Sequence, residues 1–171
     1  MPTIYVASDH RGFDQKQEIV AFLKNKGLDA IDLGPMTYAP EDDYPIYASR
    51  VVEAIKNAGD NEIACGVLIC GSAQGISIAA NRFKGIRAIA AYSEELARIG
   101  REHNDANVIC LSADYNSLAQ NERILWSFLT ADFTGEERHI RRIEMLDELG
   151  DADKAVKKQP DLDSLIIPEI F

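Results

Sequence analysis

The sequence predicts an α/β protein: a three-layer α/β/α sandwich around a five-stranded parallel sheet, Rossmann-like or flavodoxin-like, with a C-terminal helix and tail. Apolar runs alternate with amphipathic segments five times along the chain. The apolar runs are continuous, as in parallel strands that are covered on both faces. With 171 residues, the chain is long enough for one domain with a substantial core.

The expected strands share a short apolar run that ends at small or polar residues. "TIYVAS" is the first, "CGVLIC" is the most apolar, and "IRAIAAY" and "ANVICLS" follow later in the chain. These patterns predict strands at 3–8, 28–34, 65–70, 86–92 and 106–112.

The expected helices show apolar residues at a helical spacing. "GFDQKQEIVAFLKNKG" has this spacing and Gly27 as a stop signal, whereas "SEELARIGREHN" opens with Ser93 as an N-cap. "GISIAANRF" is a short helix of small residues, and "GEERHIRRIEMLDELGDADKAVKK" is mostly helical and highly charged. The sequence therefore predicts helices at 12–27, 46–59, 75–83, 93–104, 117–133 and 135–158.

The composition excludes several classes of partner. The formal net charge of −10 argues against nucleic acid or an anionic membrane surface. No apolar run approaches the roughly 18 residues of a membrane span, and the N-terminus does not resemble a signal peptide. Cys65, Cys70 and Cys110 lack metal-type spacing, which favours reduced thiols and a cytoplasmic location. The three histidines, His10, His103 and His139, are too dispersed to suggest a zinc site from their spacing alone.

Polar and titratable residues follow several of the predicted strands. Such groups occur at 8–12, 70–75, 103–105 and 112–114. Because ligands of open α/β sheets bind beyond the carboxyl ends of the strands, we expect these groups to gather at one edge. Asp9 and Ser72 have an alternative role as helix caps, since helices also begin at this edge.

The loop "CGSAQG" follows the central apolar strand and leads into a helix. Its backbone N–H groups can bind an oxyanion or a phosphate, and the same potential is expected to lower the pKa of the Cys70 thiol. No lysine stands where a Walker A loop needs one. Cys65 and Cys110 lie in strands and are interpreted as core residues. From its neighbours alone, Cys70 is either a reactive thiol or a core residue.

Arg138 and Arg142 are four residues apart in the charged helix, hence on one face. Two guanidinium groups that point the same way suit a phosphate dianion. The alternative is a solvated face on which these arginines pair with Glu137, Glu144 or similar residues.

Together these motifs resemble the type B ribose-5-phosphate isomerases and their relatives, the galactose-6-phosphate isomerases. The matching stretches are "ASDHRGFDQK", "DYPIYA", "GVLICGSAQGISIAANRFKGIRA", "REHNDANVI" and "GEERHIRRIE". They cover residues 3 to 149, which implies an isomerase domain over 1–150 and a C-terminal extension over 151–171. The resemblance implies a metal-free, cofactor-free homodimer or tetramer whose active sites lie at the subunit interface.

The resemblance also implies roles for individual residues. Cys70 matches the base that moves a proton between C1 and C2 of the open-chain sugar, because Ile76 stands where some relatives carry a glutamate. Ser72 matches a hydroxyl that shuttles a proton between oxygens, and His103, assisted by Asp9, matches the acid that opens the furanose ring. The loop N–H groups of Gly71, Ser72, Ala73, Gln74 and Gly75 match the anion hole. Asp9, His10, Tyr44 and Asn104 match substrate contacts, and Arg138 and Arg142 match phosphate ligands.

Two positions depart from the family pattern. Ala73 stands where a second loop glycine is usual, and it would be strained if that position needs a positive φ. Asp114 stands where an arginine usually binds phosphate. Either Asp114 points away from the site, a cation such as Arg141 compensates its charge, or the substrate differs.

The expected function is interconversion of a phosphorylated aldose and ketose, ribose 5-phosphate and ribulose 5-phosphate, through a cis-enediolate. An alternative is the same chemistry on a hexose 6-phosphate or an unphosphorylated sugar, which Asp114 motivates. A further alternative, which Ala73 motivates, is a module that binds a sugar phosphate without catalysis.

Overall fold

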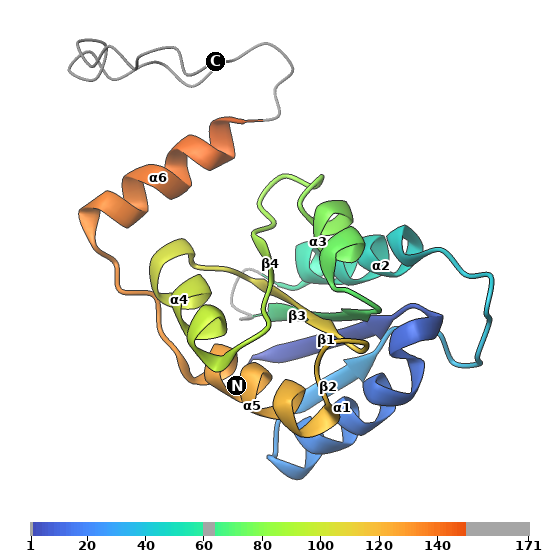
Figure 1. Cartoon of the computed structure of the whole chain (residues 1–171). Coiled ribbons are helices and arrows are strands. Elements are labelled where there is room, and N and C mark those ends of the chain that lie inside the picture. The colour runs from blue at the N-terminus through green and yellow to red at the C-terminus, as the bar shows by residue number, and fades with distance from the viewer. Residues whose placement is uncertain (1, 60–63, 150–171) are drawn as a thin grey trace, which may run out of the picture.

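A computed structural model describes residues 2–59 and 64–149 of the chain. It contains a five-stranded, fully parallel sheet with helices on both faces (Figure 1). The predicted fold class is therefore confirmed. The expected extension over 151–171 lies outside the described residues.

The strands lie close to the expected segments. They are β1 (Thr3–Ser8), β2 (Asp29–Asp32), β3 (Ala64–Cys70), β4 (Ala88–Ala90) and β5 (Val108–Ser112). Their order in the sheet is β2-β1-β3-β5-β4. The longest pairing joins β3 to β1 and β5, with Cys70 opposite Ser112. β4 is thus a three-residue edge strand, shorter than the expected 86–92.

The helices form the two outer layers. They are α1 (Phe13–Asn25), α2 (Tyr44–Asn57), α3 (Gln74–Ala80), α4 (Glu94–Asn104), α5 (Leu118–Thr130) and α6 (Glu137–Glu148), with a 3-10 turn, η1 (His10–Gly12), before α1. One core cluster joins the sheet to α1, α4 and α5 through Ile19, Ala97 and Ile124. The other joins it to α2 and α3 through Ala48 and Ile76.

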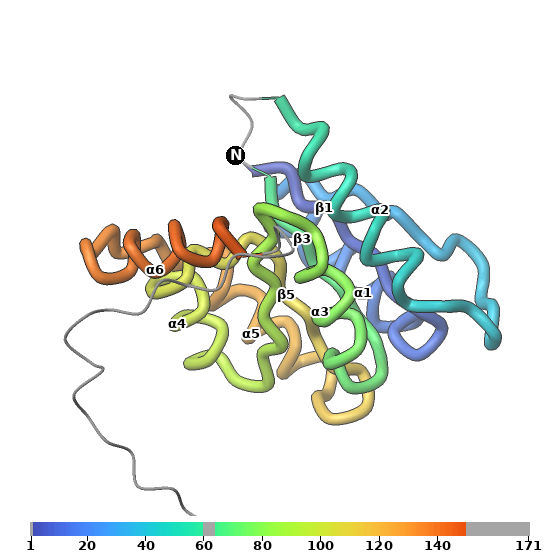
Figure 2. Tube along the Cα trace, turned by 90° about the horizontal axis from the view of Figure 1, so that it is seen from above, coloured from blue at the N-terminus to red at the C-terminus, as the bar shows by residue number. Residues whose placement is uncertain are grey.

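Helix α6 stands apart from this sandwich. It packs against α4, and both views show it projecting beyond that helix rather than covering the sheet (Figures 1 and 2). Its side chains Ile140, Leu146 and Leu149 are exposed. The described helix ends at Glu148, earlier than the expected 158.

Buried Lys16 joins α1 to the end of β2 and to the loop that follows it. Its ammonium group is 1% exposed, and it donates to both carboxylate oxygens of Asp32, at 2.7 and 2.6 Å, and to the carbonyl of Pro35 at 2.8 Å. Within the described residues, no helix is long and apolar enough to cross a bilayer.

Candidate active site

The carboxyl ends of β1, β3 and β5 bring three polar loops together at one edge of the sheet. Cys70 ends β3 beside Ser112, the last residue of β5. The Asp9 backbone N–H donates to the Ile69 carbonyl at 3.1 Å, which ties the loop after β1 to the end of β3. The expected grouping of 8–12, 70–75 and 112–114 at this edge is therefore confirmed.

The loop from Cys70 to Gly75 wraps around the Cys70 sulfur. The Ala73 N–H donates to Sγ at 3.2 Å, and the Gln74 N–H points to the Ser72 hydroxyl at 3.4 Å. Ala73 has φ 64°, so this alanine does adopt the left-handed conformation that usually favours glycine. The Ala73 methyl group is fully buried, and the core around it holds the loop in this conformation.

The expected lowering of the Cys70 pKa is wrong for the free chain. Burial raises the pKa of the thiol above its ordinary value, and the nearby Asp9 charge acts in the same direction. Backbone N–H groups of Ile76, Ala73 and Ser72 oppose this rise but do not overcome it. The thiol is 4% exposed, so desolvation outweighs the helix terminus.

Two tyrosines brace the loop from outside. Tyr92 Oη donates to the Ser72 carbonyl at 2.5 Å and accepts a hydrogen bond from Gln74 Nε2, also at 2.5 Å. The Tyr44 ring lies so close to Gly75 that a Cβ there would come within 2.8 Å of the ring. Tyr44 is thus at the site, as expected, and Tyr92 is a loop contact that the sequence did not indicate.

The Asp9 and His10 side chains both form hydrogen bonds within the loops at this edge. The Asp9 carboxylate accepts from the N–H groups of Arg11 and Gly12 at 2.9 and 3.2 Å, so Asp9 is the cap that the alternative interpretation expected. Burial nevertheless raises its pKa. His10 Nδ1 lies 2.7 Å from Asp42 Oδ1, which also accepts from the His10 N–H at 3.0 Å. Sequence reasoning missed Asp42, since its loop carries several acidic residues.

Asp114 lies against the loop and forms an ion pair. Arg11 Nη2 donates to Asp114 Oδ1 at 2.7 Å. The carboxylate lies beside Gly71, and the Asp114 N–H donates to the Gly71 carbonyl at 3.0 Å. Of the three outcomes, a compensating cation is found, but it is Arg11 and not Arg141.

His103 and Asn104 lie at the opposite edge of the sheet, so their expected place beside Cys70 in the same chain is wrong. They end α4, whose C-terminus leads back to the beginning of β5. The Asn104 carbonyl accepts from Arg87 Nε at 2.9 Å, and Arg87 directly precedes β4. A helix that connects two parallel strands runs against them, which puts its C-terminus at their starting edge.

A second cluster surrounds His103. The rings of His103 and His139 lie 4.5 Å apart between centroids, and His139 Nδ1 lies 3.0 Å from the Thr134 hydroxyl. Burial and the neighbouring His103 lower the pKa of His139. His139 stands between Arg138 and Arg142 on α6, where both arginines are exposed. Arg138 Nε pairs with Glu136 at 2.8 Å, a neighbouring glutamate of the kind that the alternative interpretation expected on a solvated face.

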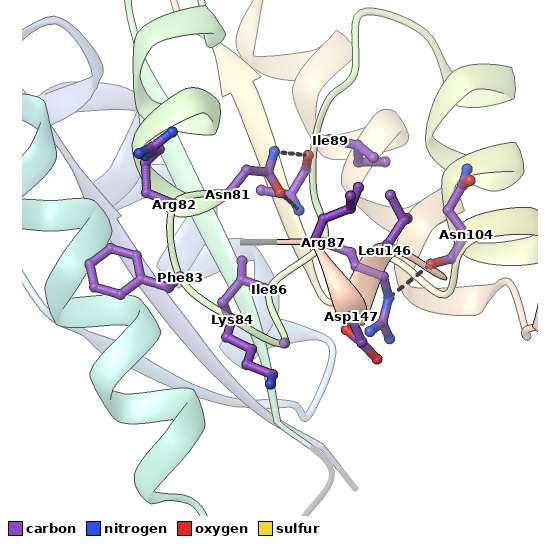
Figure 3. Close-up of a pocket in the computed structure, with 13 residues that line it drawn as sticks. Asn81, Arg82, Phe83, Lys84, Ile86, Arg87, Ile89, Asn104, Leu146 and Asp147 are labelled. Carbon is purple, nitrogen blue, oxygen red and sulfur yellow. Dashed lines mark hydrogen bonds between the residues drawn. The ribbon is translucent and has the colours of Figure 1, made fainter. Parts of the chain in front are cut away.

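A cavity of about 700 Å³ lies beside Arg87 and Asn104 (Figure 3), and no residue of the Cys70 loop lines it. It is bounded by the turn between α3 and β4 and by the end of α6, and Asn104 is the expected site residue in its lining. Arg82, Lys84 and Arg87 give it a cationic wall. Within residues 2–59 and 64–149, no group of three or more His, Cys, Asp or Glu side chains is arranged to hold a metal ion.

Known proteins with the same pattern are isomerases. The family model described as Ribose/Galactose Isomerase matches residues 4–146. The probable ribose-5-phosphate isomerase B of Mycoplasma genitalium is 41% identical over 143 residues, covering 84% of this chain and 92% of the relative. The ribose-5-phosphate isomerase B of Escherichia coli K12 is 41% identical over 147 residues, covering 85% and 95%.

Solved structures agree with the sequence relatives. The crystal structure of ribose-5-phosphate isomerase B from Mycoplasma genitalium with bound ribulose-5-phosphate has a TM-score of 0.81 and 40% identity, covering 85% of this chain and 94% of that chain. The enzyme from Thermotoga maritima has a TM-score of 0.80 and 38% identity, covering 86% and 99%.

Proposed function

The chain belongs to the ribose/galactose isomerase family, and we propose that two copies of it build each active site of a ribose-5-phosphate isomerase. The enzyme interconverts ribose 5-phosphate and ribulose 5-phosphate, an aldose–ketose isomerisation of a sugar phosphate. The observation that carries the dimer is the separation of Cys70 from His103 at opposite edges of one sheet.

The edge strand β4 offers a route by which two copies complete a site. Copies that meet along this edge about a two-fold axis perpendicular to β4 have antiparallel strands, so the carboxyl edge of one sheet comes beside the starting edge of the other. Ile78 on α3 and Leu96 on α4 are exposed apolar side chains in the layers on either side of this strand. A homodimer would bury them and bring the Cys70 loop of one protomer to His103 of the partner subunit.

In the proposed mechanism, the Cys70 thiolate removes the proton from C2 of the open-chain aldose. The electron pair moves to the carbonyl oxygen and gives a cis-enediolate, and the same proton returns to C1 to form the ketose. The loop N–H groups from Gly71 to Gly75 stabilise the negative charge that develops on the sugar oxygens. Ser72 moves a proton between those oxygens. Burial raises the pKa of the Cys70 thiol, and the backbone N–H groups of Ser72, Ala73 and Ile76 act against this rise and favour the thiolate.

The second cluster supplies ring opening and phosphate binding in this proposal. His103 of the partner subunit protonates the ring oxygen, and Asp9, with its raised pKa, assists at the anomeric hydroxyl. The partner's Asn104 contacts the sugar, together with His10 and Tyr44 of the first protomer. Arg138 and Arg142 on the exposed face of α6 bind the phosphate, a role that fits their spacing of one helical turn.

A substrate panel tests this function. Purified protein is assayed with ribose 5-phosphate, allose 6-phosphate, galactose 6-phosphate and free ribose, alongside the variants Cys70→Ala and Cys65→Ala. We expect the highest kcat/KM on ribose 5-phosphate, full activity of Cys65→Ala and none of Cys70→Ala. Higher turnover of another sugar would show that ribose 5-phosphate is not the preferred substrate. Binding of a sugar phosphate with no turnover of any sugar in the panel would favour a binding module. The cytoplasmic location stays a prediction.

A further inference from the structure

The ion pair between Arg11 and Asp114 joins two loops at the rim of the Cys70 site. Arg11 belongs to η1 after β1, and Asp114 belongs to the loop after β5, 103 residues later in the chain. The two side chains are 56% and 37% exposed, so the pair lies at the surface of the site and not within the core.

The Asp114 carboxylate puts a negative charge at the beginning of the anion-binding loop. An ideal Cβ on Gly71 would come within 2.7 Å of Asp114 Oδ2, which shows how closely the carboxylate approaches this residue. The Asp114 N–H and the Ser112 hydroxyl both donate to the Gly71 carbonyl, at 3.0 and 2.7 Å. The Asp114 backbone is therefore fixed to the loop, and its carboxylate lies beside Gly71, where its charge opposes an anion bound at the beginning of the loop.

Arg11 neutralises that charge and has donors left over. Only Nη2 of its guanidinium group makes a hydrogen bond to the described part of the chain, and that bond goes to Asp114. The stem of Arg11 runs beside Gly71, with Cγ 3.6 Å from the ideal Cβ position. The remaining N–H groups of this half-exposed side chain are thus free to bind an anion at the mouth of the site.

The other charged groups at this edge do not take this role. Asp9 and Asp42 are acidic, and His10 is held by Asp42. Lys16 is buried in its pair with Asp32. The reacting carbons of the substrate must lie near the buried Cys70 sulfur, whereas a cation at the rim suits a fixed charge several bonds away from them.

We propose that Arg11, positioned by Asp114, binds the phosphate group of the substrate and determines the preference for phosphorylated sugars. The inference rests on the proposed function and adds to it a phosphate contact from the protomer that supplies Cys70. In this arrangement the Asp114 carboxylate holds the Arg11 guanidinium group in place, and its own charge is neutralised so that it does not repel the substrate.

Steady-state kinetics of Arg11→Met, Asp114→Asn and the double variant test the inference. For Arg11→Met we expect KM for ribose 5-phosphate to rise about 10- to 100-fold, with kcat little changed, as for loss of a charged hydrogen bond. Turnover of free ribose by this variant should equal that of the wild type. The double variant should recover part of the loss, because Asp114→Asn removes the carboxylate that Arg11→Met leaves unpaired.

Arg123→Met is the matched control. Arg123 forms a similarly exposed pair with Glu94 at 2.9 Å, far along the chain from the site loops, and its loss should leave KM unchanged. An unchanged KM in Arg11→Met, or an equal loss on free ribose, would overturn the inference. If the wild type does not turn over ribose 5-phosphate, the proposed function fails. Calorimetric titration of inorganic phosphate into wild type and Arg11→Met then tests the inference. Weaker binding by Arg11→Met would support it, and equal affinities would overturn it.

Discussion

Cys70 and His103 lie at opposite edges of one parallel sheet, Cys70 where β3 ends and His103 where α4 returns toward the beginning of β5. No rotamer change can bring the thiol and the imidazole to one sugar ring within a single chain. If both side chains take part in one reaction, they come from different protomers. A protomer that lacks Cys70 and a protomer that lacks His103 should then form an active site together.

A hybrid of Cys70→Ala and His103→Ala protomers should be active, although each homodimer is inactive. In the hybrid, one site carries both substitutions and the other carries neither, so the activity should be about half that of the wild type. Differently tagged protomers allow the hybrid to be purified and assayed with ribose 5-phosphate.

A hybrid of Cys70→Ala with Ser72→Ala is the control. Both substitutions lie in one loop, so neither of its sites is intact and no activity should return. An inactive Cys70/His103 hybrid of confirmed composition would contradict the shared site.

Alkylation of Cys70 should accelerate with pH through the alkaline range. Burial raises the pKa of this thiol, so the reactive thiolate gains roughly tenfold per pH unit up to pH 9. Burial raises the pKa of Cys65 to about 12, so Cys65 should react more slowly. Iodoacetamide labelling of the free enzyme, with peptide mass analysis and Cys70→Ala as the blank, measures both rates. A rate that levels off below pH 8 would indicate a thiolate stabilised by the helix terminus.

The sheet and the Cys70 loop could be predicted from the sequence because both are local. Continuous apolar runs predict buried parallel strands, and "CGSAQG" predicts a turn from strand to helix. The sequence indicates a positive φ at position 73 only as a condition, from the glycine that the family usually carries there, and Ala73 does have φ 64°. The pKa of Cys70 could not be predicted, since it depends on how much protein covers the sulfur.

The contacts that sequence reasoning missed join distant segments. Arg11 and Asp114 are 103 residues apart, and His10 and Asp42 are 32 apart, so no spacing reveals either pair. The position of His103 is a different kind of error. A crossover helix must end at the starting edge of the strands, so the sequence already contained the information that separates His103 from Cys70.

Asp32→Ala should destabilise the fold far more than Lys16→Met. Removing the carboxylate leaves the buried Lys16 ammonium with the Pro35 carbonyl as its remaining polar contact, which costs about 3 kcal/mol or more. Removing the ammonium leaves a partly exposed carboxylate that still accepts from the Gly34 N–H at 2.8 Å. Urea unfolding of both variants at one protein concentration gives the comparison, and equal losses would contradict this account.

Gly12→Ala should destabilise the protein and move the Asp9 loop. A Cβ at position 12 would lie 2.7 Å from the Ile69 carbonyl oxygen, a backbone atom that also accepts from the Asp9 N–H. To relieve the overlap, η1 must shift away from β3, which should lower the free energy of unfolding by about 1 to 3 kcal/mol. Gly59→Ala is the control, since no atom of the described residues lies within 4 Å of its Cβ position. Equal unfolding free energies for the two variants would show that the contact relaxes freely.

The pair of His103 and His139 should make the fold sensitive to acid. Burial and the adjacent His103 lower the pKa of His139 below 6.5; Glu136 acts against this, and Arg138 and Arg142 add smaller contributions in the same direction as His103. The unfolded chain therefore binds this proton more readily, so the stability that neutral His139 contributes is present above pH 6.5 and is lost as the pH falls below it. Replacing His139 with glutamine removes the titration and should flatten the pH dependence of stability between pH 7.5 and 5.5. Urea unfolding at both values, at fixed protein concentration, measures the difference. An unchanged slope in His139→Gln would assign the acid sensitivity to other groups.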